Sequence, residues 1–154
     1  MANLIITIDG PAASGKSTVA RLLAERLGAS FLDTGAMYRA VTLAAMRAGV
    51  DMSDEEKLLG VLDGNRFGFA IKKGEISRCT SGYIGINGVD VTEQIRSPAV
   101  TANARYAASS AKVRAKLAEI QRQFADAPLG VPKRREEKIV TEGRDHGTMA
   151  FLHR

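Results

Sequence analysis

Leu4-Ile5-Ile6-Thr7-Ile8 runs into Gly10-Pro11-Ala12-Ala13-Ser14-Gly15-Lys16-Ser17, and this stretch decides the fold. Its second part fits the pattern G-x-x-x-x-G-K-[ST], a loop whose backbone N–H groups surround phosphate oxygens. The flanks fit as well, because a strand-type apolar run comes before the loop and a helical pattern comes after it. That helical pattern consists of Val19, Leu22, Leu23 and Leu27. A helix that begins under bound phosphates adds the positive end of its dipole to the anion site.

Two side chains of the loop have specific expected roles. Lys16 is expected to reach the outer phosphates as a point charge, and the Ser17 hydroxyl is expected to bind Mg²⁺. The alternative is an ordinary glycine-rich turn between a strand and a helix. Two glycines, a lysine and a hydroxyl at fixed spacing rarely coincide by chance, so we expect the loop to bind a nucleotide.

Length and composition indicate a single-domain protein that works inside the cell. The chain has 154 residues, of which 45% are hydrophobic, enough for one buried core. It has no apolar run long enough to span a bilayer, and its beginning lacks the pattern of a signal peptide. Cys79 is the single cysteine, which excludes a disulfide framework within one chain. We therefore expect a cytoplasmic protein that does not bind membranes.

The charge balance suits anionic partners, but by itself it does not say whether they are nucleotides or polymers. The chain carries 22 Lys+Arg against 17 Asp+Glu, a formal net charge of +5. The basic residues are spread along the chain rather than concentrated in one motif, and aromatic residues make up only 5% of the sequence. A stacking platform for single-stranded nucleic acid is therefore not expected.

The next part of the chain reads as a strand followed by two helices. Ser30-Phe31-Leu32 is expected to be a short buried strand, and Thr34 is a suitable helix cap. The helix that follows has a stripe of small packing residues and ends at Gly49. That stripe consists of Ala40, Val41, Ala44, Ala45 and Ala48. A shorter helix begins at Ser53-Asp54-Glu55-Glu56, and its predicted apolar face consists of Leu58, Leu59 and Leu62.

An antiparallel insert is predicted for about residues 66–91. Apolar residues alternate there at period two, a second run lies at Ile76–Cys79, and Asn87-Gly88 is a strong two-residue hairpin signal. Helices resume near Thr92, and a long one is predicted from Ser110 to about Phe124. Residues 127–138 read as an exposed basic loop, and residues 138–141 as a final strand.

This order of elements predicts a parallel sheet with helices on both faces. Ligands of such sheets bind at the carboxyl ends of the strands. Charged loops follow Ile8, Leu32 and Thr141, all at predicted strand ends. The convergence of these loops favours a site that transfers a phosphate group over a site that only binds a nucleotide.

Several motifs together resemble bacterial cytidylate kinases, members of the P-loop nucleoside monophosphate kinases. They are residues 10–18, Asp33-Thr34-Gly35-Ala36-Met37-Tyr38-Arg39, the insert at 66–96, Arg114, and Gly143-Arg144-Asp145-His146-Gly147-Thr148. The resemblance implies an α/β fold in which helices flank a P-loop NTPase-like parallel sheet, with a small hairpin insert that binds the monophosphate. It implies Mg²⁺-dependent transfer of the γ-phosphoryl group of ATP to CMP or dCMP. Residues 1–154 would form one kinase domain that matches about the N-terminal two thirds of the family.

The resemblance also implies a role for individual residues. Those expected to hold ATP are Gly10, Pro11, Ala12, Ala13, Ser14, Gly15, Lys16, Ser17 and Thr18. Lys16, Asp33 and Arg144 are expected to be catalytic, with Ser17 on the metal. The residues expected to bind the acceptor nucleotide are Thr34, Arg39, Arg114, Arg144 and Asp145. In-line transfer needs two anions held close together, so catalysis consists mainly of positioning and charge neutralisation.

Each of these residues also has a purely structural alternative. Asp33 and Asp145 could cap helices, Arg39 and Arg144 could form surface salt bridges, and Arg114 could be a solvated helix-edge residue.

The chain also departs from the family pattern. Arg105 occupies a position where the family usually has a small polar residue near the base, and Glu142 replaces a frequent Asp.

Two other functions stay open at this point. One is a nucleotide-binding fragment with little turnover, and the other is a P-loop kinase for another small acceptor, such as shikimate or adenylate. The family continues for about another seventy residues, which carry a strand or two and an arginine-bearing lid. The 154 residues alone are therefore expected to turn over CMP poorly and to self-associate, whereas a complete chain is expected to be a monomer.

Overall fold

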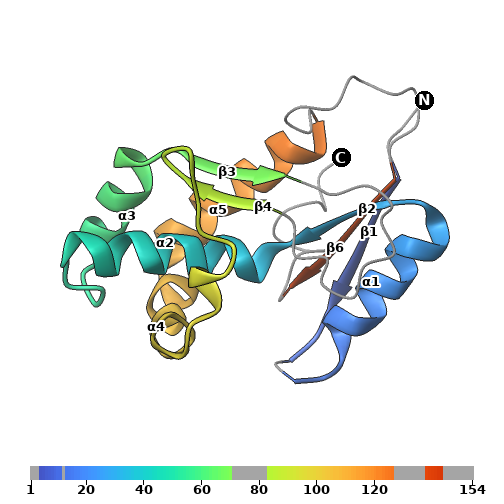
Figure 1. Ribbon diagram of the computed structural model, residues 1–154, viewed down its shortest axis with the longest axis horizontal. Coiled ribbons are helices and arrows are strands. Elements are labelled where there is room, and N and C mark those ends of the chain that lie inside the picture. The colour runs from blue at the N-terminus through green and yellow to red at the C-terminus, as the bar shows by residue number, and fades with distance from the viewer. Residues whose placement is uncertain (1–3, 12, 71–82, 127–137, 144–154) are drawn as a thin grey trace. The chain divides into compact units, whose positions relative to one another are not determined.

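The computed structural model describes residues 4–11, 13–70, 83–126 and 138–143 (Figure 1). Its contacts divide the chain into two compact units, which are described separately. The first, here called the sheet unit, takes in residues 1–34, 70–82 and 119–154. The second, here called the helical unit, takes in residues 35–69 and 83–118.

The sheet unit contains a parallel sheet of three strands, as predicted. The strands are β1 (Leu4–Asp9), β2 (Ser30–Asp33) and β6 (Lys138–Gly143), in the spatial order β1-β6-β2. The last strand in sequence is thus inserted between the first two. β6 is buried from Ile139 to Glu142, which is typical of a strand covered on both faces.

The helix α1 (Lys16–Leu27) follows the phosphate loop as the helical spacing predicted, but not all apolar residues of that pattern are buried. Ala20 and Ala24 are buried and cluster with Val140 of β6, whereas Val19 and Leu22 are 56% and 53% exposed. Small alanine side chains allow the helix axis to approach the strand closely, so the large apolar residues do not mark the contact. Leu23 is partly buried against this cluster. Gly28 ends the helix as predicted, with φ 58°.

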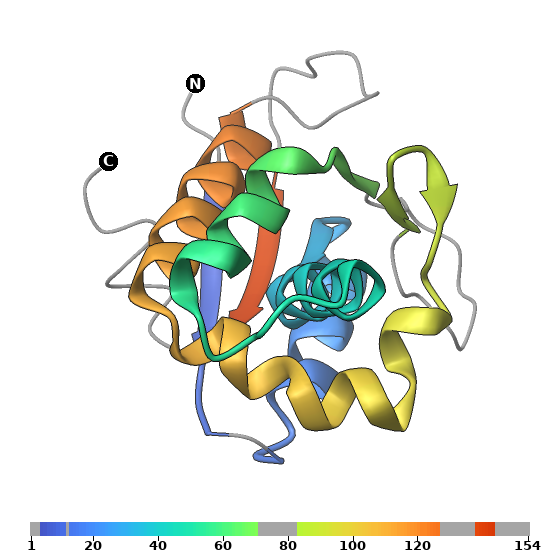
Figure 2. The ribbon, with the colours of Figure 1, turned by 90° about the vertical axis from the view of Figure 1, so that its left-hand side faces the viewer.

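The helical unit is built around α2 (Thr34–Ala48), which Figure 2 shows nearly end-on among α3, α4, the first half of α5 and the β3–β4–β5 hairpins. The packing stripe predicted for α2 is confirmed except at Ala48, which is exposed. The buried members of the stripe, Ala40, Val41, Ala44 and Ala45, are at most 5% exposed, and Ala36 and Met37 of the same helix are buried as well. Gly49 ends α2 with φ 63°.

The helix α3 (Glu55–Gly64) begins within the predicted start signal, and its cap is Asp54. The Asp54 carboxylate accepts hydrogen bonds from the N–H groups of Glu56 and Lys57. Its buried face contains Leu58 and Leu62 as expected, with Val61 rather than Leu59 as the third member. Positions i, i+3 and i+4 form one helix face, which is why Val61 takes this place.

The antiparallel insert contains β3 (Phe67–Ala70), β4 (Tyr83–Ile86) and β5 (Val89–Asp90), in the order β3-β4-β5. Asn87 and Gly88 have φ values of 53° and 84°, the two positive values that a type I′ hairpin turn requires. The hairpin predicted at this dipeptide is confirmed. The predicted run at Ile76–Cys79 lies outside the described residues.

Two further helices complete the described chain. A 3₁₀ turn (Gln94–Arg96) leads to α4 (Pro98–Ser109), which Ser97 caps, and α5 spans Ala111–Asp126. Val113 and Leu117 of α5, which lie four residues apart on one face of the helix, are fully buried. The predicted basic loop lies almost entirely outside the described residues. None of the helices in the described ranges is long and apolar enough to cross a membrane.

Candidate functional site

The phosphate loop makes a tight turn between β1 and α1. A side chain at Gly10 would bring its Cβ to 3.1 Å from Ser14 Oγ, closer than most real Cβ contacts. Gly15 has φ 81°, a left-handed value that favours glycine, and Ala13 has φ 60°. The loop therefore favours glycine at both fixed positions, because a side chain at position 10 would crowd Ser14 and the backbone at position 15 is left-handed.

Lys16 lies over the loop that precedes it. Its Nζ donates to the carbonyl oxygen of Pro11 at 3.2 Å, and Ser14 Oγ donates to the same oxygen at 2.8 Å. The lysine charge is thereby held at the loop, where phosphate oxygens would bind. Ala12 lies outside the described residues.

The start of α1 is suited to an anion. The first turn contains no acidic residue, and the cap residue, Gly15, has no side chain to occupy the first N–H groups. The first hydrogen bond of the helix runs from the N–H of Val19 to the carbonyl oxygen of Gly15, at 3.1 Å. The N–H groups of Lys16, Ser17 and Thr18 precede that bond and have no acceptor within the helix.

Ser17 joins the loop to the end of β6. Its hydroxyl lies 2.7 Å from each carboxylate oxygen of Glu142, and Glu142 is only 6% exposed. A hydroxyl beside a carboxylate is a donor set that fits Mg²⁺, which prefers oxygen ligands and keeps waters and phosphate oxygens as the others. In the described part of the chain, no group of three or more His, Cys, Asp or Glu residues could hold a metal ion. The Ser17–Glu142 pair is a candidate metal position because of its own donor set.

The sequence does not identify Glu142 as a site residue, because it marks Glu142 only as a replacement for an Asp that is frequent in the family. Its position at the end of a predicted strand was the available signal. What the sequence could not reveal is the contact with Ser17, which is 125 residues away along the chain.

The carboxyl ends of the three strands lie at one edge of the sheet, as expected for parallel strands. The strand register pairs Asp33 of β2 with Glu142 of β6, and on the other side Glu142 pairs with Ile8 of β1. The Gly10 N–H donates to the carbonyl of Gly143 at 3.3 Å. These bonds fix the beginning of the phosphate loop beside the end of β6.

Thr34 is buried at this edge, only 1% exposed, and its hydroxyl donates to the backbone carbonyl of Glu142. The Thr34 hydroxyl therefore holds β6 in register at the start of α2. Its contact with the acceptor nucleotide stays a prediction. Arg144 and Asp145 lie outside the described residues.

The helical unit contains the two other predicted substrate residues, Arg39 on α2 and Arg114 on α5, both half-buried. The Arg114 guanidinium donates a hydrogen bond to the Tyr38 hydroxyl. Burial raises the pKa of Tyr38 above its ordinary value, and the charge and hydrogen bond of Arg114 offset part of this rise. Tyr38 is therefore a neutral phenol at physiological pH, with its oxygen available to hold the arginine.

Arg105, the departure from the family pattern, is exposed on α4. Its guanidinium carbon lies 5.0 Å from the centroid of the Tyr106 ring, and Nη2 lies 3.3 Å from the Tyr106 hydroxyl. The Arg105 side chain is thus held along the surface of its own helix by a cation–π contact.

Comparison with known proteins identifies the family. The family model described as "Cytidylate kinase" matches residues 6–153. Similar proteins named cytidylate kinase include one from Rhodopirellula baltica, 40% identical over 148 residues, which are 96% of this chain and 56% of that protein. Another, from Symbiobacterium thermophilum, is 39% identical over 152 residues, 97% of this chain and 60% of that protein. A third, from Pelotomaculum thermopropionicum, is 42% identical over 148 residues, 95% of this chain and 58% of that protein.

The chain thus spans between 56% and 60% of the length of these relatives. The match to the family model nevertheless runs through almost all of its 154 residues. The chain belongs to the cytidylate kinase family.

Proposed function

We propose that this chain is part of an enzyme that phosphorylates CMP or dCMP with ATP and Mg²⁺. The acceptor is taken from the name that its relatives carry. The observation that carries the proposal is the contact of the Ser17 hydroxyl with both carboxylate oxygens of Glu142, at the start of the helix below the phosphate loop. Such a contact prepares a hydroxyl and a carboxylate for one hard cation beside the phosphates.

On the donor side, residues 10–18 hold the phosphates of ATP. The backbone N–H groups at the start of α1 donate to phosphate oxygens, and Lys16 neutralises the charge of the outer phosphates. Ser17 and Glu142 would hold Mg²⁺, which would neutralise part of the phosphate charge. Asp33, which pairs with Glu142 in the sheet, is the further catalytic residue that we propose for this edge.

On the acceptor side, Arg39 binds the phosphate of CMP and Arg114 reads the base. Arginine suits the first task because its planar guanidinium donates two parallel hydrogen bonds to a phosphate and stays charged at any physiological pH. We also assign Thr34, Arg144 and Asp145 to the acceptor nucleotide, as the family resemblance implies. The insert at about 66–91 is the monophosphate-binding part of a single kinase domain.

The proposed reaction is an in-line displacement. A phosphate oxygen of CMP attacks the γ-phosphorus of ATP, the bond from this phosphorus to the β–γ bridging oxygen breaks, and ADP leaves. The protein contributes position and charge rather than covalent chemistry. The phosphate loop holds the charge of Lys16 close to the phosphate site. The contact between Ser17 and Glu142 holds the two proposed metal ligands together.

The test is CMP-dependent release of ADP by the full-length protein and its Glu142→Gln variant, measured against Mg²⁺ concentration. Glutamine keeps the size and removes the charge, so we expect at least a tenfold loss of kcat at low Mg²⁺ and partial recovery at high Mg²⁺. Thr101→Ala is the matched control, because it removes an exposed hydroxyl from the first turn of α4. An unchanged Mg²⁺ dependence in Glu142→Gln would contradict the proposed metal position.

A further inference from the structure

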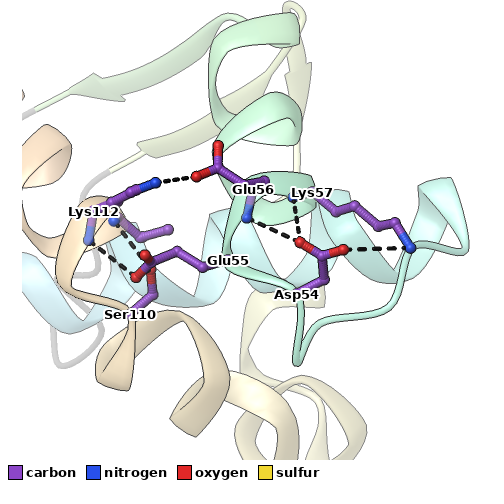
Figure 3. Close-up of polar contacts among 7 residues, drawn as sticks. Asp54, Glu55, Glu56, Lys57, Ser110 and Lys112 are labelled. Atoms are coloured by element: carbon purple, nitrogen blue, oxygen red, sulfur yellow. Dashed lines mark hydrogen bonds and ion pairs between the residues drawn. The ribbon is translucent and has the colours of Figure 1, made fainter.

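The start of α5 is held by a residue of another helix. Glu55 is the first residue of α3, and its Oε2 accepts hydrogen bonds from Ser110 Oγ at 2.6 Å and from the N–H of Lys112 at 3.2 Å (Figure 3). The N–H of Ala111 also donates to this carboxylate. One carboxylate of α3 therefore binds N–H groups of α5 that have no partner within their own helix.

Ser110 connects this carboxylate to the first turn of α5. Its Oγ accepts from the N–H of Val113 at 3.2 Å, and its carbonyl accepts from the N–H of Arg114 at 3.0 Å. Ser110 is only 8% exposed. Arg114 thus lies on a turn whose starting residue is fixed by Glu55.

Two further polar contacts between α3 and α5 join the ends of exposed side chains. Lys112 Nζ pairs with Glu56, and Lys116 Nζ lies 3.7 Å from Asp63 (Figure 3 shows the first pair). Exposed ion pairs between long side chains contribute little to the position of a helix, because both side chains can follow a shift. Glu55 differs because it binds the backbone of α5 directly.

We propose that Glu55 is a positioning residue for Arg114, because its cap on α5 fixes where the guanidinium is presented to the acceptor nucleotide. This inference rests on the proposed function, in which Arg114 binds CMP. Tyr38 of α2 also holds the Arg114 guanidinium. The Arg114 side chain is therefore fixed at its guanidinium by Tyr38, and its helix, α5, is fixed at its first turn by Glu55. A displacement of about 1 Å in a positioned group is enough to weaken its contact with a substrate severely.

Two conservative variants of the full-length protein separate the effect of the length of the Glu55 side chain from the effect of its charge. Glu55→Gln keeps the length and an accepting oxygen, so we expect the KM for CMP to stay within about twofold of the wild-type value. Glu55→Asp keeps the charge and loses the reach, so we expect the KM for CMP to rise about threefold to tenfold. The KM for ATP is expected to change less than about twofold in both variants, a difference that general loss of structure would not produce.

Glu56→Gln is the matched control, because it changes the same charge on the neighbouring residue of α3 and removes only an exposed ion pair. We expect no change in either KM. Glu55→Asp combined with Arg114→Ala should be no worse for CMP than Arg114→Ala alone, because the positioned group is then absent.

The outcomes distinguish this inference from the proposed function. If Arg114→Ala leaves the KM for CMP unchanged, the proposed role of Arg114 is wrong and the inference loses its basis. If Arg114→Ala raises it but Glu55→Asp does not, the proposed function stands and Glu55 has no positioning role. Equal increases for CMP and ATP in Glu55→Asp would also overturn the inference.

Discussion

Removal of the Ser17 hydroxyl should destabilise the protein as well as weaken metal binding. In Ser17→Ala, the Glu142 carboxylate stays buried at 6% exposure but loses a donor at 2.7 Å from both of its oxygens. A hydrogen bond to a charged group contributes about 1.5–3 kcal/mol, and a buried charge that loses its donor keeps its desolvation cost. We therefore expect the free energy of unfolding to fall by about 1.5–3 kcal/mol.

A double-mutant cycle isolates this contact. Ser17→Ala, Glu142→Ala and the double variant are unfolded in urea without nucleotide or Mg²⁺, and the coupling free energy is calculated from the three changes in stability. We expect a coupling of about 1.5–3 kcal/mol, with Ser17→Ala less harmful when Glu142 is already alanine. Thr18→Ala, which removes an exposed hydroxyl from the same turn, should change stability by less than about 0.5 kcal/mol. A coupling below about 0.5 kcal/mol would refute the reasoning, since contacting residues in one network couple more strongly.

Three further predictions follow from the loop, the α3–α5 contact and the surface of α1. Lys16→Ala should abolish phosphoryl transfer and leave the circular dichroism spectrum native, because Lys16 bonds only to its own loop in the described contacts; unchanged turnover would contradict the phosphate-loop assignment. The Ser110 hydrogen bond lowers the pKa of Glu55 below its ordinary value, so the stability that this bond contributes is present above the unfolded-state pKa and is lost as pH falls through the lower, folded-state pKa. Wild-type stability should accordingly fall more than that of Glu55→Gln when urea unfolding is repeated from neutral pH down into the acid range, and parallel pH profiles would contradict this. The 154-residue chain alone should self-associate in sedimentation experiments, because β1 is an edge among the described strands and Val19 and Leu22 are more than half exposed; a monodisperse monomer would show this to be wrong.

The sequence predicted those parts of the fold that short, local signals determine. Gly28 and Gly49 end their helices with positive φ, and Asn87-Gly88 forms its hairpin, because few other residues adopt these conformations. The phosphate loop is recognisable for the same reason. Its glycines are required by the backbone itself, whatever the rest of the chain does.

The predictions failed where contacts between distant segments decide the structure. The buried face of α1 consists of Ala20 and Ala24 because β6 approaches that side of the helix, and helical periodicity alone selected larger residues. The insertion of β6 between β1 and β2 does not follow from the strand patterns alone. The contacts of Glu142 with Ser17 and of Glu55 with Ser110 likewise join residues far apart in sequence. Both carboxylates looked like ordinary polar positions at the end or start of an element.

The most direct test of the proposed function is a coupled kinase assay on the full-length protein with CMP, dCMP, UMP and AMP as acceptors. The proposed function predicts that CMP or dCMP is phosphorylated fastest, with kcat in the range of about 1–100 s⁻¹ that is usual for kinases. It also predicts that Lys16→Ala abolishes this activity for every acceptor. Preferred phosphorylation of AMP, or binding of ATP with no transfer to any of the four acceptors, would contradict it.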